Sequence, residues 1–386
     1  MRYILTTLFL LSFYSISQVK IKDTLFSKAL NQNREIIIQT PEKLDSTKRY
    51  PLLIALDGDY LNYSLNGEVS LYSYFDKIPA CITVSIPQNY IDTVANKFRR
   101  WVDCDYAWKN GLPEKQGIAF QKFILTELVP YLESNYPIAP FKAILGHSFT
   151  ANFINYFLLD EKETFSGFGA ISPYYADNSF DTIINTLSRL TQPIRYFVSV
   201  GENDNSGHKK SVNLFTKQVD KLDNKNLDYK RYSTKNNEAT HYTIVSKSMP
   251  YLIEHLLLPY TAISEDQFKM LLKEKDKYAF LLNKYEKIKE LYGVDLKIRK
   301  EDFSTVGYAM YKKGEWDDIY KLGELQLKLY PESYDGYYTL GGYYEHQKEY
   351  EKALDYYQKG YNKLGEEVSN KQDFMQDIDR VKKKLK

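Results

Sequence analysis

The sequence predicts an α/β fold, in which a parallel sheet carries helices on both faces, followed by a separate all-helical region. Between Pro51 and residue 260, short apolar runs alternate with helix-length segments. Strands of a parallel sheet have this continuous apolar character because helices bury both of its faces. From Ser264 to the end, the chain is instead rich in Lys, Glu and Tyr and has almost no strand-like run. We therefore expect an α/β domain over residues 18–260 and a helical domain over residues 264–386.

Separate sequence patterns predict the strands of the sheet and one of its helices. Two segments around a polar turn, residues 19–24 and 34–39, predict an antiparallel hairpin at the edge of the sheet. Apolar residues at helical spacing predict a helix over residues 118–136, which ends before Pro137. The expected core strands are residues 52–56, 81–86, 143–145, 168–171 and 196–200, with a further strand at 227–232.

The C-terminal region contains an internal repeat. Trp316 and Tyr350 belong to similar stretches at an offset of 34 residues, and Gly307 and Gly341 have the same spacing. This period resembles the tetratricopeptide repeat, which implies a surface for a protein partner; two ordinary amphipathic hairpins are the alternative. Because such repeats are usually stable only in groups of three or more, we expect the helices from residue 266 to 291 to pack on as a cap.

The composition excludes some classes of function. The 386 residues suffice for two or three domains, and 43% of them are hydrophobic, as in soluble globular proteins. The 52 Lys and Arg nearly cancel the 50 Asp and Glu, so we expect no nucleic-acid partner. The two cysteines leave two alternatives: one disulfide bond between Cys81 and Cys104 in an oxidising compartment, or a free Cys81 buried in an apolar strand.

The N-terminus has the pattern of a secretory signal. Arg2 precedes an apolar run that extends to Ile16, and the small residues Ser15 and Ser17 mark a cleavage site. The run is shorter than the about 20 apolar residues that span a membrane, which disfavours the alternative of a membrane anchor. We expect residues 1–17 to be a signal peptide and the mature protein to be periplasmic or secreted, with no membrane span.

One motif has the form of a nucleophile turn. Gly146-His147-Ser148-Phe149-Thr150 lies between an expected strand and a helix-length stretch. A serine at such a sharp turn projects its hydroxyl above the sheet, with a helix N-terminus behind it. Ser148 is therefore the expected nucleophile. The second position after the serine is usually glycine, and the bulk of Thr150 there can press on the neighbouring strand and shift the nucleophile.

A serine nucleophile needs a base, and the base needs an acid that orients it. In this type of fold the acid follows the serine along the chain, and the histidine comes last. The segment after the strand at 196–200 offers Glu202 and Asp204, of which we prefer Asp204. His241 lies in a polar loop after the strand at 227–232 and is the expected base.

The other four histidines have plainer interpretations as packing or surface residues. His147 is expected to point away from the serine, and His208 follows the acid too soon along the chain. His255 lies in a Leu-rich helix, and His346 belongs to the repeats. No clustered spacing of Cys and His indicates a metal site, and the expected chemistry requires no cofactor.

Two backbone N–H groups are expected to form an oxyanion hole. One is the N–H of Phe149, directly after the serine, and the other is that of Asp59 in the loop Leu56-Asp57-Gly58-Asp59. A plain turn at Asp57-Gly58 is the alternative interpretation of this loop.

Several stretches along residues 19–258 together match the pattern of one family: Arg34 with Gln39-Thr40-Pro41, Tyr50-Pro51-Leu52-Leu53, Leu56-Asp57-Gly58, Arg100-Trp101-Val102-Asp103, Gly146-His147-Ser148-Phe149, Gly201 to Asp204, and His241. On these stretches, the chain resembles an esterase family with the α/β-hydrolase fold that includes enterochelin esterases, S-formylglutathione hydrolase and the mycolyl transferases. The resemblance implies that Arg99 or Arg100 lines the mouth of the active site and contacts substrate; plain surface charges are the alternative.

Together these patterns predict an exported serine hydrolase that cleaves carboxylic esters through an acyl-enzyme. The same residues would perform acyl transfer to a sugar or lipid, which is one alternative. A non-catalytic binding protein with a hydrolase fold is another. The expected substrate is a small-molecule or glycan ester, since the insertions at residues 60–77 and 89–114 are rich in aromatic side chains.

Overall fold

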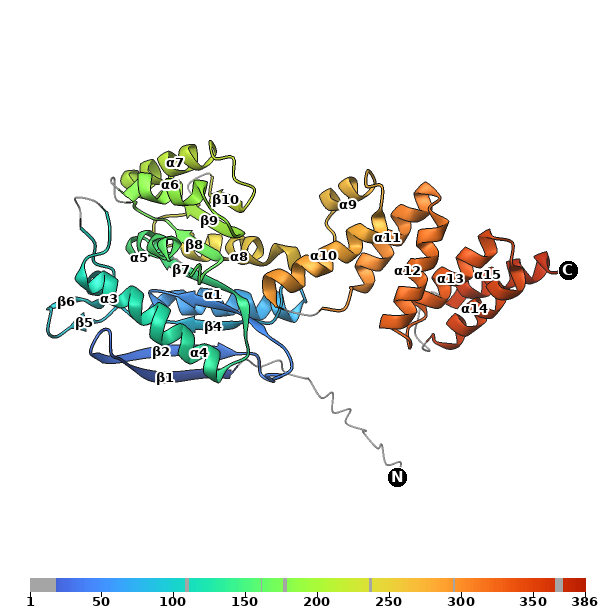
Figure 1. Ribbon diagram of the computed structural model, residues 1–386, viewed down its shortest axis with the longest axis horizontal. Coiled ribbons are helices and arrows are strands. Elements are labelled where there is room, and N and C mark those ends of the chain that lie inside the picture. The colour runs from blue at the N-terminus through green and yellow to red at the C-terminus, as the bar shows by residue number, and fades with distance from the viewer. Residues whose placement is uncertain are drawn as a thin grey trace, which may run out of the picture. The chain divides into compact units, whose positions relative to one another are not determined.

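The structure, a computed structural model, describes residues 19–107, 111–160, 162–175, 179–235, 238–293, 296–364 and 371–386. The chain divides into two compact units, Met1–Leu258 and Pro259–Lys386. In Figure 1 the ribbon of the first unit runs from blue to yellow and that of the second from orange to red. The predicted signal peptide, residues 1–17, lies outside the described residues.

An eight-stranded sheet forms the centre of the N-terminal unit, with the order β1-β2-β4-β3-β7-β8-β9-β10. The hairpin β1–β2 lies at one edge, as predicted. Within this sheet, the pairs β1–β2 and β2–β4 are antiparallel, and all other pairs are parallel. The strands are β1 (Val19–Ser27), β2 (Gln32–Thr40), β3 (Tyr50–Ala55), β4 (Ile82–Ser85), β7 (Ile138–His147), β8 (Gly167–Ile171), β9 (Ile194–Val200) and β10 (Leu227–Ser233), with β5 (Ile91–Asp92) and β6 (Lys97–Phe98) as a separate pair.

Helices bury both faces of this sheet, which confirms the predicted fold class. All six residues of β3 are buried. On one face, α1 (Gly58–Tyr74) and α8 (Ile244–Leu257) pack against each other and against the strands β3, β4, β8 and β9. On the other, α5 (Phe149–Phe153) and α7 (Ser206–Val219) pack against β7 and β9. The remaining helical elements of this unit are α2 (Arg99–Asp103), α3 (Lys115–Phe123), η1 (Ile124–Leu128), α4 (Val129–Asn135), η2 (Ile154–Leu159) and α6 (Phe180–Ser188).

The helix predicted over residues 118–136 is present but not uniform. α3, the π-helical turn η1 and α4 follow one another without a break. The helix ends at Asn135, and Tyr136 is extended, because a residue before proline avoids helical backbone. Phe120, Phe123 and Leu128 from its inner side lie in the main core of the unit.

The loops with Ser148, Asp204 and His241 follow three parallel strands of the sheet. β7 ends at His147, β9 at Val200 and β10 at Ser233. The carboxyl ends of parallel strands meet at the same edge of a sheet, where ligand sites of α/β proteins form. The fold therefore gathers these loops at one place.

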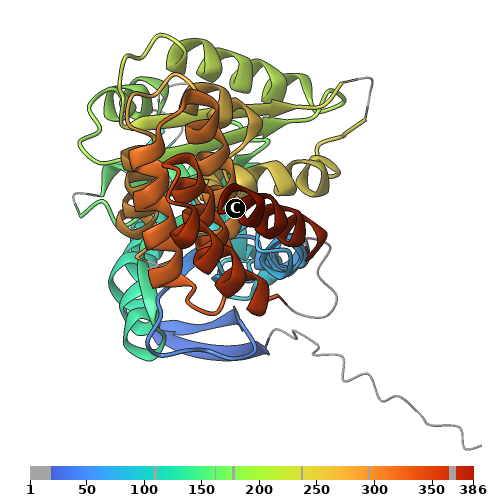
Figure 2. The ribbon, with the colours of Figure 1, turned by 90° about the vertical axis from the view of Figure 1, so that its right-hand side faces the viewer.

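The C-terminal unit is all-helical, as predicted. Figure 2 shows its successive helices α12–α15 packed side by side, in agreement with their contacts. The second helices of two successive hairpins begin at Trp316 and Tyr350, at the 34-residue spacing seen in the sequence. Membership of the tetratricopeptide family stays a prediction. The elements are η4 (Leu258–Tyr260), α9 (Glu265–Leu271), α10 (Lys277–Tyr292), α11 (Lys300–Lys313), α12 (Trp316–Leu329), α13 (Asp335–His346), α14 (Tyr350–Asn362) and α15 (Lys371–Lys384).

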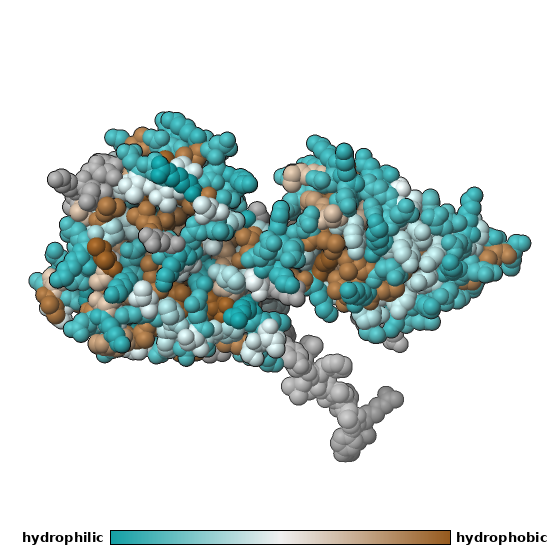
Figure 3. Space-filling view, in the orientation of Figure 1, coloured by the Kyte–Doolittle hydropathy of each residue, from teal (hydrophilic) through white to brown (hydrophobic). Residues whose placement is uncertain are grey.

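The visible surface of both units is mainly hydrophilic, with scattered apolar patches (Figure 3). Within the described ranges, no helix is long and apolar enough to cross a membrane. Cys81 and Cys104 are both buried and both free, so they are not joined by a disulfide bond.

Candidate active site

Ser148 occupies a strained turn between β7 and α5. Its backbone is in the positive-φ region (φ 61°), which few residues other than glycine adopt. The N–H of Ser148 donates to the carbonyl of Ile171 at 2.8 Å, which fixes the turn against β8. A Cβ at Gly146 would lie 2.6 Å from the backbone of Thr150. The turn therefore requires glycine two residues before the serine.

Three expected residues are joined by hydrogen bonds. Nε2 of His241 lies 2.9 Å from Oγ of Ser148, and Nδ1 of His241 lies 2.8 Å from Oδ1 of Asp204. The loops of Asp204 and His241 pack closely, since a Cβ at Gly201 would lie 2.4 Å from the carbonyl oxygen of Ala239. The geometry is that of a nucleophile, a base and an orienting acid.

The alternative acid does not join this group. Glu202 is exposed, and its backbone N–H donates to Oγ1 of Thr234 at 3.0 Å. Its carbonyl accepts a hydrogen bond from the ammonium of Lys209 at 2.9 Å. Asp204, in contrast, is 5% exposed and faces His241.

Ser172, which follows β8, is a site residue that the sequence analysis missed. Its buried hydroxyl donates to Oδ2 of Asp204, and Oγ lies 3.0 Å from Nδ1 of His241. Ser172 also has a positive φ, 47°. Strained residues of this kind concentrate at functional sites, because the surrounding structure must hold them in place. The signal in the sequence is its position directly after a buried strand, next to the strand that ends in the nucleophile turn.

Electrostatics keep Asp204 ionised. Burial opposes its ionisation, but hydrogen bonds from His241 and Ser172 outweigh this effect and lower the pKa of the carboxyl. The carboxylate therefore remains a hydrogen-bond acceptor for both partners.

His208, at the start of α7, lies beside His241, with ring centroids 4.3 Å apart. Its Nδ1–H donates to the carbonyl of Ser172 at 2.9 Å. Burial and the neighbouring His241 lower the pKa of His208, which favours a neutral ring. Its interpretation from sequence as a remote packing or surface residue did not anticipate this position.

A hydrogen-bonded cluster of polar side chains stabilises the turn at Ser148. We define it as Asp57, Tyr60, Arg100, His147 and Thr150. Oδ2 of Asp57 accepts hydrogen bonds from the Thr150 hydroxyl at 2.7 Å and from Arg100 at 2.9 Å, and it lies 3.1 Å from the Tyr60 hydroxyl. The Thr150 hydroxyl also accepts the backbone N–H of His147 at 2.8 Å. Thr150 thus contributes a hydroxyl to this cluster where glycine is usual.

His147 connects the cluster to the loop of His241. Its Nε2 lies 2.8 Å from the carbonyl oxygen of His241, and its Nδ1 lies 2.7 Å from the hydroxyl of Tyr60. Burial lowers the pKa of His147 to about 3, so the ring is neutral. A neutral ring with one N–H satisfies both contacts, by donating to the carbonyl and accepting from the tyrosine. The side chain of His147 thus contacts the loop that carries His241.

The two expected oxyanion donors lie at the starts of helices. Phe149 is the first residue of α5, and Asp59 is the second residue of α1. N–H groups in the first turn of a helix have no carbonyl partner within that helix. The hydrogen bond between Asp57 and Thr150 brings these two helix starts together. Both donors therefore stay candidates for the oxyanion hole.

Arg99 and Arg100, one of which is expected to line the mouth of the active site, both have hydrogen-bond or ion-pair partners within the protein. Arg99 is 5% exposed and forms an ion pair with Asp92 at 2.7 Å. Arg100 donates to Asp57 and, at 3.1 Å, to the carbonyl of His147. Asp103, in the same short helix, holds the fully buried Arg34 through two hydrogen bonds of 2.8 and 2.7 Å. Substrate contact by Arg99 or Arg100 stays a prediction.

The N-terminal unit has an α/β-hydrolase fold. The chain belongs to the esterase family described as "Putative esterase", whose model matches residues 27–245. It is thus a member of a family of hydrolases. A search of the curated proteins found no match to this chain.

Solved structures share this fold. An uncharacterised protein from Capnocytophaga ochracea is similar with a TM-score of 0.75 and 22% identity, over 95% of this chain and 100% of that one. An IroE-like serine hydrolase from Shewanella oneidensis has a TM-score of 0.57 and 18% identity, over 77% and 95%. BES protein from Bacillus cereus has a TM-score of 0.53 and 20% identity, over 62% and 94%.

Proposed function

We propose that the N-terminal unit is a serine esterase that cleaves carboxylic esters through an acyl-enzyme. The observation that supports this most directly is the continuous hydrogen-bonded chain from Ser148 through His241 to Asp204. This chain stands at the carboxyl edge of the sheet, on a strained turn, in a member of an esterase family.

In the proposed reaction, Oγ of Ser148 attacks the ester carbonyl while Nε2 of His241 takes its proton. His241 then gives this proton to the leaving alcohol, and the acyl group stays on Ser148. Water, activated by the same nitrogen, releases the acid and restores the hydroxyl. Asp204 stabilises the imidazolium that forms in both steps, because its carboxylate accepts the Nδ1–H.

The negative charge that develops on the carbonyl oxygen needs donors. We assign this role to the backbone N–H groups of Phe149 and Asp59, at the starts of α5 and α1. Removing one such donor typically costs about 3 kcal/mol of transition-state stabilisation. Because both are backbone groups, their side chains are free to vary.

The proposal includes export and a small substrate. The N-terminal signal pattern in residues 1–17 supports a periplasmic or secreted protein. A small-molecule or glycan ester fits the esterase family and the aromatic side chains around the site, of which Tyr106 lies against Phe149 with ring centroids 5.4 Å apart. N-terminal sequencing of the protein recovered from its producing cells tests the export: cleavage after Ser17 is expected.

The C-terminal unit is proposed to bind a protein partner. Its helices α11–α15 form a groove of about 790 Å³. Trp316 and His346 stack in this groove with ring centroids 3.8 Å apart, and the exposed Tyr311 lines it beside them. An aromatic groove of this size suits a peptide segment.

Kinetics of the Ser148→Ala variant test the proposed function. We expect loss of p-nitrophenyl ester hydrolysis by roughly 10⁴-fold, the cost of removing a member of such a triad, with little change in melting temperature. Asp204→Asn and Glu202→Gln serve as a matched pair, of which only the first should lose activity strongly. Activity of Ser148→Ala above a tenth of the wild-type value would refute the proposal.

A further inference from the structure

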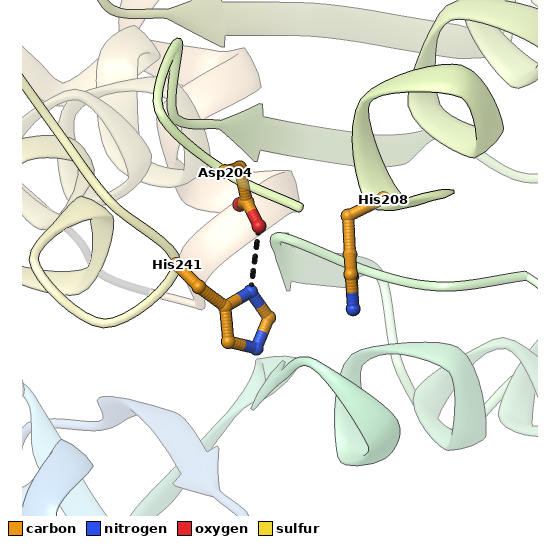
Figure 4. A group of neighbouring side chains, drawn as sticks. All are labelled: Asp204, His208 and His241. Carbon is orange, nitrogen blue, oxygen red and sulfur yellow. Dashed lines mark hydrogen bonds and ion pairs between the residues drawn. The ribbon is translucent and has the colours of Figure 1, made fainter. Parts of the chain in front are cut away.

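Three side chains of the candidate site lie close enough to share a metal ion. Asp204, His208 and His241 each offer a ligand atom, and these atoms lie within 4.8 Å of one another. Across the part of the chain that the structure describes, no other group of three or more His, Cys, Asp or Glu has this property. Figure 4 shows the two imidazoles side by side, with Asp204 bonded to His241.

The hydrogen bonds identify which nitrogen of His208 carries its proton. The carbonyl of Ser172 has no proton to donate, so Nδ1 of His208, at 2.9 Å, carries the hydrogen of this bond. Nε2 of a neutral His208 then holds a lone pair. The proposed hydrolysis gives this nitrogen no task. His208 is thus a metal-competent imidazole beside the base.

Ser172 holds two members of this group in place. Its carbonyl accepts a hydrogen bond from Nδ1–H of His208, and its hydroxyl donates a hydrogen bond to Asp204. Metal-binding histidines commonly have their second nitrogen fixed in this way by a carbonyl or a carboxylate.

We propose that Asp204, His208 and His241 form an inhibitory zinc site. Two imidazoles and a carboxylate are a ligand set that Zn²⁺ prefers, with bonds of about 2.0 to 2.2 Å. Tetrahedral ligands at such distances lie roughly 3.4 Å apart, so the ligand atoms, now within 4.8 Å of one another, must approach by up to about 1.4 Å. His208 lies in the first turn of α7, and its side chain is only half-buried. Rotation of this side chain can therefore supply the movement.

Zinc binding would stop the proposed esterase, on which this inference rests. Hydrolysis uses both nitrogens of His241: Nε2 exchanges the proton with Ser148, and Nδ1 donates to Asp204. A metal ion on either nitrogen removes one of these functions. No spacing in the sequence indicates this site, since His241 lies far along the chain from Asp204 and His208.

Zinc binding is tested first without catalysis. The Ser148→Ala protein is titrated with ZnCl₂ by calorimetry, and one site per chain is expected. Adding His208→Gln should weaken binding by at least about 10-fold, the loss that even an outer-shell partner of a metal ligand causes. His346→Gln, in the C-terminal unit, is the matched control and should leave the affinity unchanged. Binding that survives both His208→Gln and His241→Gln would overturn the site.

Inhibition is then measured with the full-length wild-type chain. We expect Zn²⁺ to block ester hydrolysis at the concentration that saturates the Ser148→Ala protein, and EDTA to restore it. His208→Gln, compared with its own rate without metal, should need at least about 10-fold more zinc. Full activity at saturating zinc would overturn the inhibitory role. Histidine-dependent zinc binding in a wild-type chain with no esterase activity would instead refute the proposed function and leave the zinc site standing.

Discussion

At the level of single residues, the candidate site contains Ser172 in addition to the three expected residues Ser148, Asp204 and His241. The hydroxyl of Ser172 bonds Asp204 and approaches Nδ1 of His241, so it restrains the acid and the base together. The positive φ of Ser172 costs conformational energy that the fold must offset. We therefore regard Ser172 as a positioning residue.

We predict that Ser172→Ala and Ser172→Gly both lower kcat by roughly 10- to 100-fold, because a hydrogen bond to a charged group is worth about 1.5 to 3 kcal/mol. KM should change little. Glycine adopts the positive φ without strain, so Ser172→Gly separates loss of the hydroxyl from loss of the turn. Ser188→Ala, at an exposed serine of α6, is the control. Wild-type kcat in Ser172→Gly would show that the hydroxyl has no positioning role.

Local patterns were sufficient to predict some residues of the site but not others. Ser148 has a local signal, since strand, turn and helix follow one another in the sequence. Ser172 and His208 acquire their places only when β8 and α7 stand beside the loop of His241. Thr150 was expected to strain the turn through its bulk, whereas its hydroxyl bonds Asp57 across the fold. A single-residue pattern contains no information on such long-range partners.

At the scale of elements, glycines set how closely the C-terminal helices pack. A Cβ at Gly341 in α13 would lie 2.6 Å from the ring of Tyr357 in α14. At the next residue, Gly342, the nearest atom would be 3.8 Å away. The two positions share one helix and one neighbour, Tyr357, and differ in how closely it approaches.

We predict opposite effects of alanine at these two positions. Gly341→Ala should lower the unfolding free energy by about 1 to 3 kcal/mol, because the buried ring of Tyr357 has no room to move. Gly342→Ala should raise it by up to about 1 kcal/mol, the difference in helix propensity. Urea unfolding of both variants checks this. Equal effects would contradict the close packing of α13 and α14.

A second element-level contact makes stability depend on pH. Glu345 in α13 accepts hydrogen bonds from Arg380 in α15 at 2.8 and 2.7 Å. This contact, with Lys384 and Tyr357, lowers the pKa of Glu345 from 4.5 to about 2. A lowered carboxyl pKa stabilises the fold above the unfolded pKa, and the contribution disappears as pH falls toward the folded one.

We therefore predict that Arg380→Gln destabilises the protein at pH 7, and that its difference from wild type narrows as the pH falls from 5 toward 2. Urea unfolding across this range measures the difference. Lys359→Gln removes the exposed pair with Asp355 and should have a small effect at every pH. A difference for Arg380→Gln that is constant with pH would exclude the ion pair with Glu345 as its cause.

Sequence periodicity correctly predicted several helices and strands. The edge hairpin, the central strands and the helix before Pro137 were predictable because burial imposes periods of two or 3.6 residues. The π-helical turn η1 was not, since its sequence Ile-Leu-Thr-Glu-Leu has ordinary helical spacing. Boundaries and local irregularities depend on packing that periodicity does not encode.

At the scale of the whole molecule, all proposed catalytic residues belong to the first unit, Met1–Leu258. The protein from Capnocytophaga ochracea has a similar fold over 95% of this chain, a range that includes most of the second unit. The proposed functions are divided in the same way, with the proposed chemistry in the first unit and the proposed partner binding in the second.

We predict that a chain truncated after residue 262 keeps most of its activity on small soluble esters. The reason is that the proposed hydrolysis uses only the sheet and its loops, whereas the groove of the second unit is proposed to bind a partner. Kinetics and melting of the truncated and full-length proteins, measured side by side, check this. A folded but inactive truncated protein would show that the helical unit shapes the active site.

Covalent labelling can establish, without knowledge of the substrate, whether Ser148 is a nucleophile activated by His241. The purified protein is treated with a fluorophosphonate, and the modified peptide is mapped by mass spectrometry. We expect one adduct, on Oγ of Ser148, with labelling strongly slowed in His241→Ala and absent in Ser148→Ala. An adduct on another residue, or equal labelling of wild type and Ser148→Ala, would contradict the account.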